Sequence, residues 1–250
     1  MNRYDIIGDI HGCAYEFSML MEKLGYSWNT YSGRVIFKPT DGRVLVSVGD
    51  IADRGRSSGT VFNIVHDMVK AGYMKLARGN HDDKLMRWAK GNSVIQNYGL
   101  DKTILELQKL DVERESVFEF LKGIPHYLSL DDGKLIVVHA AWRKSLGNRD
   151  PFHKKCRTWC LYGPTTGKTL SNGLPDRIDW VPERELDKDS PIVVYGHQPY
   201  KEPRVLNKTY GIDTGCVFGG YLTALRYPEM EFVQVKAAEV YDNSKPDLRE

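Results

Sequence analysis

Aspartate and histidine follow the first apolar stretch of the chain. Residues Tyr4 to Ile7 have the pattern of a buried strand, and Asp9 and His11 come after it, between two glycines. Residues two apart project to the same side of an extended chain, so the carboxylate and the imidazole should point together at the end of the strand. A single pair of this kind is more often a turn or capping device than a metal site.

The same ending recurs after four further apolar stretches. The sequences VLVSVGD, KLARGNH, LIVVH and IVVYGH end in the polar residues Asp50, Asn80, His81, His139 and His197. An open α/β sheet keeps its ligand crevice at the carboxyl ends of its strands, so we expect these groups to converge on one site. Oxygen and imidazole ligands without thiolate favour a catalytic site for Mn, Fe, Ni or Zn.

These groups are suited to bind two divalent ions, most readily manganese. Asp50 would bridge the two ions. Asp9 and His11 would bind one of them, and Asn80 and His139 would bind the other. Two ions about 3.5–4 Å apart can hold a hydroxide between them, direct it at phosphorus and neutralise the phosphate oxygens. The full set of expected ligands is Asp9, His11, Asp50, Asn80, His139 and His197.

Charged residues next to these ligands complete a site for phosphate-ester hydrolysis. His81 follows Asn80 and would be free to protonate the leaving oxygen. Asp53 could orient that imidazole and keep it charged, and Arg54 and Arg78 would clamp the phosphate oxygens. Asp53 could be only a turn residue and Arg54 only a surface charge, but the motif GDIADRG favours the functional interpretation.

Alternating strands and helices are needed to position these groups. After the first strand, the pattern predicts a helix from Phe17 to Leu24, a strand from Arg43 to Val48 and a helix from Ser57 to Lys70. This β-α-β order implies parallel strands with right-handed crossovers. Residues 82–122 are helical in pattern with two glycine breaks, and residues 126–140 predict a hairpin closed by Asp-Asp-Gly.

The second half of the chain changes character. Proline, glycine and aromatic residues are dense between Trp142 and Pro191 and indicate loops and short helices. The segments PIVVYGH, KTYGIDTG, YLTALRY and EFVQVKA then predict a second, mostly antiparallel sheet. Helices early and strands late favour an α/β fold in which two packed sheets have helices outside. We expect one domain over residues 1–240 and a flexible tail over 241–250.

Composition excludes several other classes of protein. A formal net charge of +2 provides no strong basic track, so any nucleic acid would be recognised through its terminal one or two nucleotides. The four cysteines lack a CxxC pair and no apolar signal segment precedes the first strand, which favours reduced thiols in the cytoplasm. No apolar run approaches the length of a membrane span.

Two further patterns have ordinary explanations. GPTTGKT has three residues between its glycines, whereas a phosphate-binding P-loop needs four, so we reject a kinase activity. Trp159, Tyr162, Trp180 and Tyr200 could stack nucleobases, but aromatic residues at this spacing are more often part of the core.

Several motifs of the chain resemble one known family. GDIHG, GDIADRG and GNHD, followed by a histidine after an apolar strand and a later GH, resemble the calcineurin-like metallophosphoesterases, which include phosphoprotein phosphatases and diadenosine-tetraphosphate hydrolases. CLYGPTTGKT, VVYGHQP, EPR and IDTGCVFGGYLTALRYPE are similar to the phosphatase module of bacterial polynucleotide kinase-phosphatase and its single-domain relatives of the diadenosine-tetraphosphate-hydrolase type. The resemblance implies a four-layer α/β/β/α sandwich of two mixed sheets, two metal ions and the ligand roles given above. It also places Asp213 of IDTG near the ligands or in the substrate wall.

The resemblance leaves more than one substrate class open. We expect hydrolysis of phosphate groups at RNA or DNA ends (2′,3′-cyclic phosphate, 2′- or 3′-phosphate) or of nucleotides. The alternatives are a bis(5′-nucleosyl)-tetraphosphatase and a serine/threonine/tyrosine protein phosphatase. Arg78, directly before GNH, is typical of the protein-phosphatase and dinucleotide-hydrolase branch, and Gln198 stands where many relatives have threonine. A non-catalytic binding module would be expected to have lost ligands, and all six are present.

Overall fold

Two mixed β-sheets form the centre of the molecule in the computed structural model, which describes residues 2–31, 33–171, 173–244 and 249. The first sheet has the order β13-β14-β1-β4-β5, with β15 paired to β14, and the second has the order β11-β12-β10-β7-β6. The strands of the first sheet are β1 (Tyr4–Ile7), β4 (Val44–Ser47), β5 (Met74–Leu76), β13 (Asp213–Thr214), β14 (Tyr221–Tyr227) and β15 (Glu231–Lys236). Those of the second are β6 (Tyr127–Leu130), β7 (Leu135–Val138), β10 (Ile192–Tyr195), β11 (Arg204–Leu206) and β12 (Thr209–Gly211).

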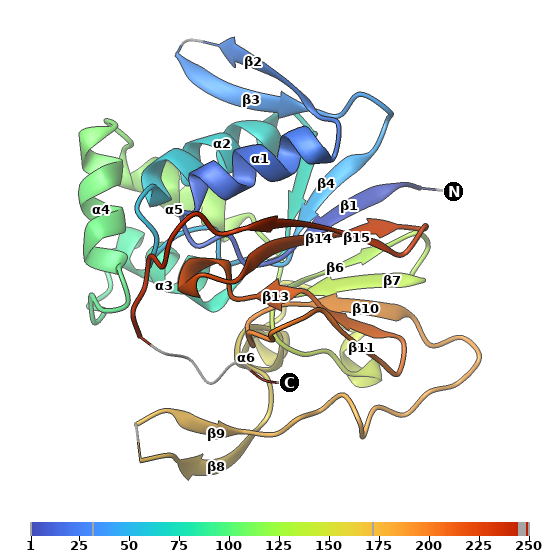
Figure 1. The fold of residues 1–250 in the computed structure, drawn as a ribbon. Helices are drawn as coiled ribbons and strands as arrows, with labels where there is room; N and C mark the ends of the chain where they lie inside the picture. The colour runs from blue at the N-terminus through green and yellow to red at the C-terminus, as the bar shows by residue number, and fades with distance from the viewer. Residues whose placement is uncertain (1, 32, 172, 245–248, 250) are drawn as a thin grey trace.

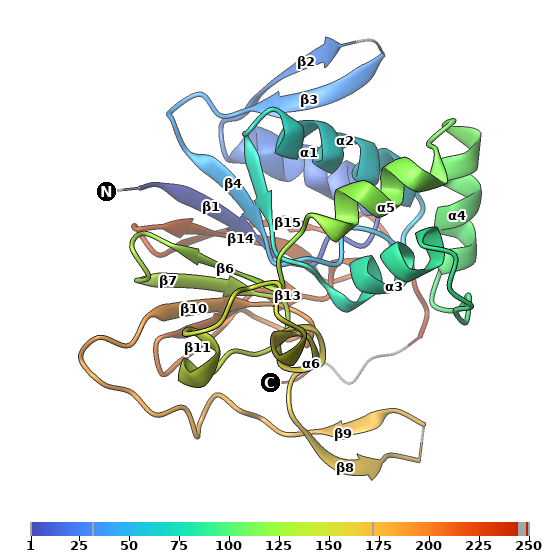
Figure 2. The same ribbon diagram turned by 180° about the vertical axis from the view of Figure 1, so that it is seen from behind.

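Helices cover the outer faces of both sheets, which gives four layers from top to bottom in Figure 1. The helices that pack on the first sheet are α1 (Ala14–Lys23), α2 (Ser58–Lys70), α3 (Asn80–Ala89), α4 (Leu100–Lys109) and α5 (Arg114–Lys122). On the second sheet lie α6 (Lys154–Tyr162) and the 3-10 turn η1 (Lys144–Leu146), while the 3-10 turn η2 (Cys216–Phe218) precedes β14. Figure 2 shows the same layers from behind. The four-layer α/β/β/α prediction is confirmed.

Three apolar clusters, one for each interface between layers, hold the sandwich together. In β1, Ile7 faces the helices while Ile6 faces the other sheet. In β7, Val137 faces the first sheet while Ile136 and Val138 face α6. Neighbouring residues of a strand point to opposite faces, so strands that are apolar throughout are buried on both sides.

The expectation of a separate, mostly antiparallel second sheet is wrong. β14 and β15 come late in the chain but join the first sheet, where β14 pairs antiparallel with β1. The second sheet is mixed, because β7, β10 and β12 are parallel to one another. A short apolar segment carries no information about which sheet it will join. The predicted hairpin with its Asp-Asp-Gly turn is confirmed as β6 and β7.

Two hairpins outside the main sheets were not predicted. They consist of β2 (Ser27–Tyr31) with β3 (Arg34–Lys38), and β8 (Thr165–Thr169) with β9 (Pro175–Arg177). The segment GPTTGKT ends α6 and forms the exposed strand β8. It therefore does not wrap around a phosphate in the manner of a P-loop.

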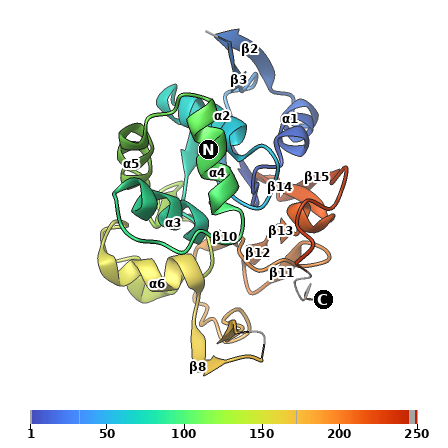
Figure 3. The same ribbon diagram turned by 90° about the vertical axis from the view of Figure 1, so that its left-hand side faces the viewer.

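The strands that precede the predicted ligands all end at one edge of the sandwich. β1, β4 and β5 are parallel in the first sheet, as are β7 and β10 in the second. This edge is on the left in Figure 1 and faces the viewer in Figure 3. Among the residues that the structure describes, no helix is both long enough and apolar enough to cross a membrane.

The predicted flexible tail lies partly outside the described residues, at 245–248 and 250. In its described part, the Tyr241 hydroxyl donates to Glu16 Oε1 at 2.9 Å, and the backbone N–H of Arg249 donates to the Pro199 carbonyl at 3.1 Å. The C-terminal segment therefore contacts both halves of the sandwich.

Arg43 is expected to make the largest single ionic contribution to stability. Its buried guanidinium donates to Asp5 Oδ1 at 3.3 Å and to the backbone carbonyls of Tyr4 and Tyr227 at 3.2 Å each. Removing one partner of a buried pair leaves an uncompensated charge, so Arg43→Ala should lower the free energy of unfolding by about 3–5 kcal/mol in urea titrations.

Arg3→Ala is the matched control, because Arg3 lies 3.4 Å from Asp41 and 3.5 Å from Glu229, which also pair with Arg43. Its side chain is 45% exposed, so the loss should be at most about 1 kcal/mol. Equal losses in the two variants would contradict this account of Arg43.

Candidate functional site

The six predicted ligands come together at the carboxyl edge of the strands. One group surrounds Nε2 of His139, which lies 2.9 Å from His197 Nδ1, 3.0 Å from Asn80 Oδ1 and 3.4 Å from Asp50 Oδ2. One ring nitrogen cannot donate a single proton to three such neighbours. Their convergence is instead the arrangement expected of donor atoms that share a ligand.

A second group shares the same carboxylate. His11 Nε2 lies 3.6 Å from Asp50 Oδ2 and 4.0 Å from Asp9 Oδ2. The backbone N–H of His197 is 3.2 Å from both carboxylate oxygens of Asp9, which joins the two groups. Asp50 Oδ2 therefore lies between imidazoles of the two groups, at the position that a bridging ligand requires.

Burial sets the charge of these groups. It is the main reason why the pKa values of His11, His139 and His197 lie well below the usual range. Burial also raises the pKa of Asp50 to about 7, and burial followed by repulsion from other carboxylates raises that of Asp9. Neutral imidazoles keep a lone pair for a metal, and crowded buried carboxylates are stabilised by a cation, so the donor set fits divalent ions.

The backbone is strained where the ligands lie. His11, Asp50 and His197 have φ values of 44°, 52° and 69°, a region that residues other than glycine rarely adopt. Two glycines allow the chain to approach the carboxylates: a Cβ on Gly79 would lie 2.1 Å from Asp50 Oδ1, and one on Gly196 would lie 2.0 Å from Asp9 Oδ1. The surrounding packing must compensate for this strain.

A hydrogen bond to the carboxylate of Asp53 holds His81 next to the second group. Its Nδ1 lies 2.7 Å from Asp53 Oδ2, and the Thr103 hydroxyl donates to Asp53 Oδ1 at 2.7 Å. Burial alone would lower the pKa of His81, but Asp50 and Asp53 outweigh it and raise that pKa. The side chain also lies within metal-binding reach of His11 and Asp50. Its hydrogen bond to Asp53 favours a charged imidazolium, which cannot bind a metal.

Asp82 is a site residue that the sequence analysis missed. Its Oδ2 accepts from the backbone N–H groups of Asp50 at 2.9 Å and Gly79 at 2.8 Å, and its Oδ1 accepts from that of Ile51 at 3.1 Å. It thus fixes the loop after β4 to the beginning of α3. The signal was available in GNHDD, since an acidic residue in the first turn of a helix commonly caps its N–H groups.

The two predicted phosphate-clamping arginines have different surroundings. Nη2 of Arg78 donates to the carbonyls of Leu121, Lys122 and Ile124 at 2.9, 3.0 and 2.6 Å. The last carbonyls of a helix lack helical partners and attract cations. The prediction that Arg78 clamps phosphate is therefore corrected, because this side chain secures the end of α5.

Arg54 lies at the predicted site but has a carboxylate partner that the sequence did not indicate. Its guanidinium stacks on the rings of Tyr98 and Phe218, 5.0 and 5.3 Å from their centres. Its Nη1 pairs with Asp242 Oδ2 at 2.5 Å. Asp242 lies 188 residues further along the chain, so no local pattern could have revealed it.

Two more charged residues border the ligands. Asp213 is buried. After burial, repulsion from Asp213 is the largest cause of the raised pKa of Asp9. Burial raises the pKa of Asp213 itself to about 6. On the other side is Arg177, which was not predicted. Burial and a neighbouring histidine are the two largest causes of the lowered pKa values of His139 and His197, and the charge of Arg177 is the third.

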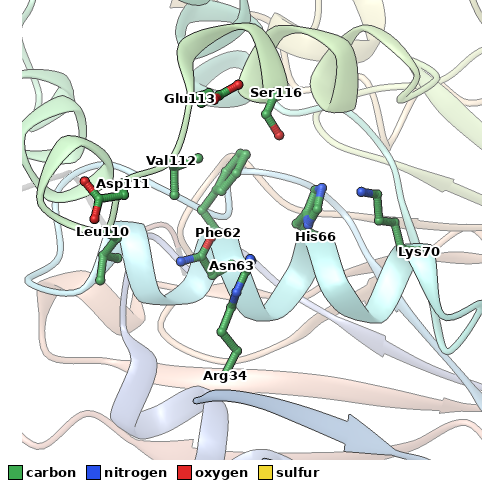
Figure 4. Close-up of a pocket in the computed structure, with 10 residues that line it drawn as sticks. All are labelled: Arg34, Phe62, Asn63, His66, Lys70, Leu110, Asp111, Val112, Glu113 and Ser116. Carbon is green, nitrogen blue, oxygen red and sulfur yellow. The ribbon is translucent and has the colours of Figure 1, made fainter. Parts of the chain in front are cut away.

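Two other features are separate from this site. Cys13, Glu16 and Cys216 form a third group that could hold a metal ion, but Glu16 Oε1 accepts from Ala238 N–H at 2.8 Å and from the Tyr241 hydroxyl, so it anchors the C-terminal segment. A pocket of about 300 Å³ lies beside α2 and α5, and its ten lining residues, labelled in Figure 4, include none of the predicted site residues.

Solved structures confirm the fold. A proposed diadenosine tetraphosphatase superposes with a TM-score of 0.63 at 22% identity and covers 94% of both chains. A protein serine/threonine phosphatase from Saccharomyces cerevisiae has a TM-score of 0.65 at 15% identity, covering 99% of this chain and 82% of its own. At these identities the likeness concerns the fold alone.

Sequence comparisons identify the family. A bis(5′-nucleosyl)-tetraphosphatase PrpE [asymmetrical] from Anoxybacillus flavithermus is 44% identical over 243 residues, 95% of this chain and 96% of the relative. One of the same name from Bacillus cereus is 44% identical over 245 residues, 94% of this chain and 95% of the relative. The model of the calcineurin-like phosphoesterases matches residues 3–230. The chain therefore belongs to the calcineurin-like phosphoesterase family.

Proposed function

We propose that the protein is a metal-dependent bis(5′-nucleosyl)-tetraphosphatase. The observation that carries the hydrolytic activity is the pair of histidine and aspartate groups that share Asp50 Oδ2. Relatives that bear the tetraphosphatase name match the chain over almost its whole length at 42–44% identity. We therefore rank this alternative above the hydrolysis of RNA or DNA ends, which the sequence analysis placed first.

The six predicted ligands are proposed to hold two divalent ions. Neutral imidazoles and a shared carboxylate suit manganese, and also nickel, iron or zinc. When bound, such ions supply Lewis acidity that lowers the pKa of water and neutralises phosphate oxygens. His197 Nδ1 and Asn80 Oδ1 lie 2.9 and 3.0 Å from His139 Nε2, so these three atoms are placed to share one ion.

His81 is proposed to protonate the leaving oxygen. The hydrogen bond between Nδ1 and Asp53 fixes the ring orientation, so Nε2 is the atom that meets the substrate. The raised pKa of His81 keeps its proton available near neutral pH. Thr103 fixes Asp53 in turn, and the hydroxyl is buried with it.

Arg54 is proposed to bind phosphate oxygens, whereas Nη1 of Arg177 donates to the Tyr162 carbonyl and secures the end of α6 as Arg78 secures that of α5. A tetraphosphate chain carries several negative charges that two divalent ions cannot neutralise alone. The guanidinium of Arg54 is positioned by two aromatic rings and by Asp242 before substrate arrives. Preorganisation of this kind lowers the entropic cost of binding.

A cytoplasmic location is part of the proposal. All four cysteines are buried and free. Cys13 and Cys216 lie within metal-binding reach of each other and are nevertheless unbonded. Reduced neighbouring thiols are typical of a reducing compartment.

Replacing His81 tests its role as an acid. His81→Ala should retain its bound metal and lose about 10²–10⁴-fold in kcat on an alkyl phosphate, whose alkoxide leaving group needs protonation. The loss on 4-nitrophenyl phosphate should be much smaller, because nitrophenolate is a stable leaving group. Metal content is measured by elemental analysis. Equal losses on the two substrates would show that His81 has another role.

Replacing Asp242 tests whether it positions Arg54. Asp242→Asn removes a charge-assisted hydrogen bond and should raise KM for 4-nitrophenyl phosphate by about tenfold, with a smaller change in kcat. Glu239→Gln is the matched control, because Glu239 pairs with Arg56 at 2.9 Å on the exposed part of the same segment. A lower KM in Asp242→Asn would mean that Asp242 competes with phosphate for Arg54.

A comparison of four substrates tests the proposed function. The purified protein is assayed with manganese and after chelation on diadenosine tetraphosphate, a 2′,3′-cyclic-phosphate RNA end, a 3′-phosphate end and a phosphopeptide. We expect the highest kcat/KM on diadenosine tetraphosphate, a requirement for metal, and two unequal nucleotide products, ATP and AMP.

Asp50→Asn provides the blank for this assay, since activity that survives in it would come from a contaminant. A higher kcat/KM on either RNA end would restore the first expectation from the sequence. Preference for the phosphopeptide would assign the protein to the protein phosphatases.

A further inference from the structure

A second pocket lies in the segment that links β7 to β10. It has a volume of about 570 Å³, within the range of small-molecule sites. We call it the tryptophan pocket, and its apolar walls are formed by Trp142, Trp159, Pro164, Ile178 and Trp180. Its outer wall is formed by residues between Ile178 and Pro191, which belong to the strand-free segment between β9 and β10 in Figure 1. We infer that the tryptophan pocket binds a nucleoside moiety of the substrate, an inference that rests on the proposed function.

The aromatic walls pack against the core on one side and are partly exposed to the pocket on the other. Tyr200 is buried against Tyr195, as expected, but Trp159 and Trp180 are only half-buried. Arg143 stacks on Trp159, 4.4 Å from the ring centre. The side chain of Trp142 is only 5% exposed, and its Nε1 donor has no hydrogen-bond partner among the described residues. Aromatic faces with an unused donor suit a flat heterocycle that has acceptor atoms.

The charges of the rim favour a nucleoside over a phosphate chain. Glu183, Glu185 and Asp189 line the pocket, and Asp187 pairs with Lys144. The two other cations of the lining have partners, because Arg143 stacks on Trp159 and Arg184 donates to backbone carbonyls. Carboxylates accept hydrogen bonds from ribose hydroxyls and from exocyclic amino groups, and they repel phosphate. The phosphate chain would therefore lie outside this pocket, toward the ligand groups.

The outer wall is built before any ligand binds. Arg184 donates to the carbonyls of Asn207 at 2.7 Å and Pro191 at 2.6 Å. The side-chain amide of Asn207 donates to the Val181 carbonyl at 3.0 Å. These bonds fix both ends of the acidic loop to the sheet, so the pocket does not require ordering of that loop.

None of the predicted site residues lines the tryptophan pocket, but the backbone connects its walls to the ligand groups. Trp142 follows the ligand His139 by three residues, and the backbone N–H of Ala140 donates to the Cys160 carbonyl in α6 at 2.7 Å, next to Trp159. On the other wall, Pro164 follows Gly163, where a Cβ would lie 4.0 Å from the Cβ of Ala140, the residue after His139. A substrate held by its phosphates at the ligand groups can therefore extend into the pocket.

Substitution of the aromatic wall tests this inference. Trp180→Ala and Trp159→Ala should each raise KM for diadenosine tetraphosphate by about tenfold relative to KM for 4-nitrophenyl phosphate, which lacks a nucleoside. Trp180→Phe keeps an aromatic face and should restore most of the affinity. Trp28→Ala is the matched control, because Trp28 is 64% exposed on the β2 hairpin. Circular dichroism establishes that each variant is folded.

Direct binding separates this inference from the proposed function. Adenosine, followed by saturation-transfer NMR, should bind the wild-type protein and the Trp28→Ala protein but not Trp180→Ala. Hydrolysis of diadenosine tetraphosphate with an unchanged KM ratio in both pocket variants would overturn the inference and leave the proposed function intact. Adenosine binding that depends on Trp180, in a protein that does not hydrolyse the dinucleotide, would uphold the pocket and reject the proposed function.

Discussion

The position of the Asp50 carboxylate is the constraint on which the site depends. One of its oxygens must lie between imidazoles that come from different sheets, His11 after β1 and His139 after β7. The other oxygen accepts the backbone N–H of His81 at 2.9 Å. Asn80 and His81 are the first two residues of α3. This bond therefore positions both Asn80, a proposed ligand, and His81, the proposed acid. A small shift of Asp50 would therefore disturb both groups at once.

Apolar packing compensates for the cost of assembling these groups. Three of the six predicted ligands, His11, Asp50 and His197, have left-handed backbone conformations, and the buried ligands lose much of their hydration. Neither feature stabilises the folded chain. The three apolar clusters that separate the four layers supply the favourable burial, and they hold the strand ends of both sheets at one edge. Favourable packing of the layers therefore compensates for the backbone strain at the site.

The sequence was sufficient to predict the layers and the convergence of the six ligands, because both follow from local patterns. Strands that are apolar on both faces predict burial, and polar residues at their carboxyl ends predict a crevice. The destination of β14 and the partners of Arg78 and Arg54 were not predictable, because they depend on contacts between segments far apart in the chain. Arg78 and Arg54 have the same charge and lie in the loops that follow two neighbouring strands, β5 and β4. One secures the end of a helix and the other is held at the site, and only the fold distinguishes them.

Substrate choice was the hardest property to derive, since the ligand motifs are shared by hydrolases of very different phosphate esters. Discrimination must come from residues that contact the leaving group. The tryptophan pocket, the proposed nucleoside site, lies in the segment between β7 and β10, where the sequence shows no periodicity. Composition predicted that its aromatic residues belong to the core, which is correct for Tyr200, while Trp180 packs against the core and also lines the tryptophan pocket. Exposure depends on whether a neighbouring segment covers a side chain. In this segment Arg184 and Asn207 fix the acidic loop to neighbouring backbone, and the loop and the tryptophans line opposite parts of one pocket instead of covering each other completely.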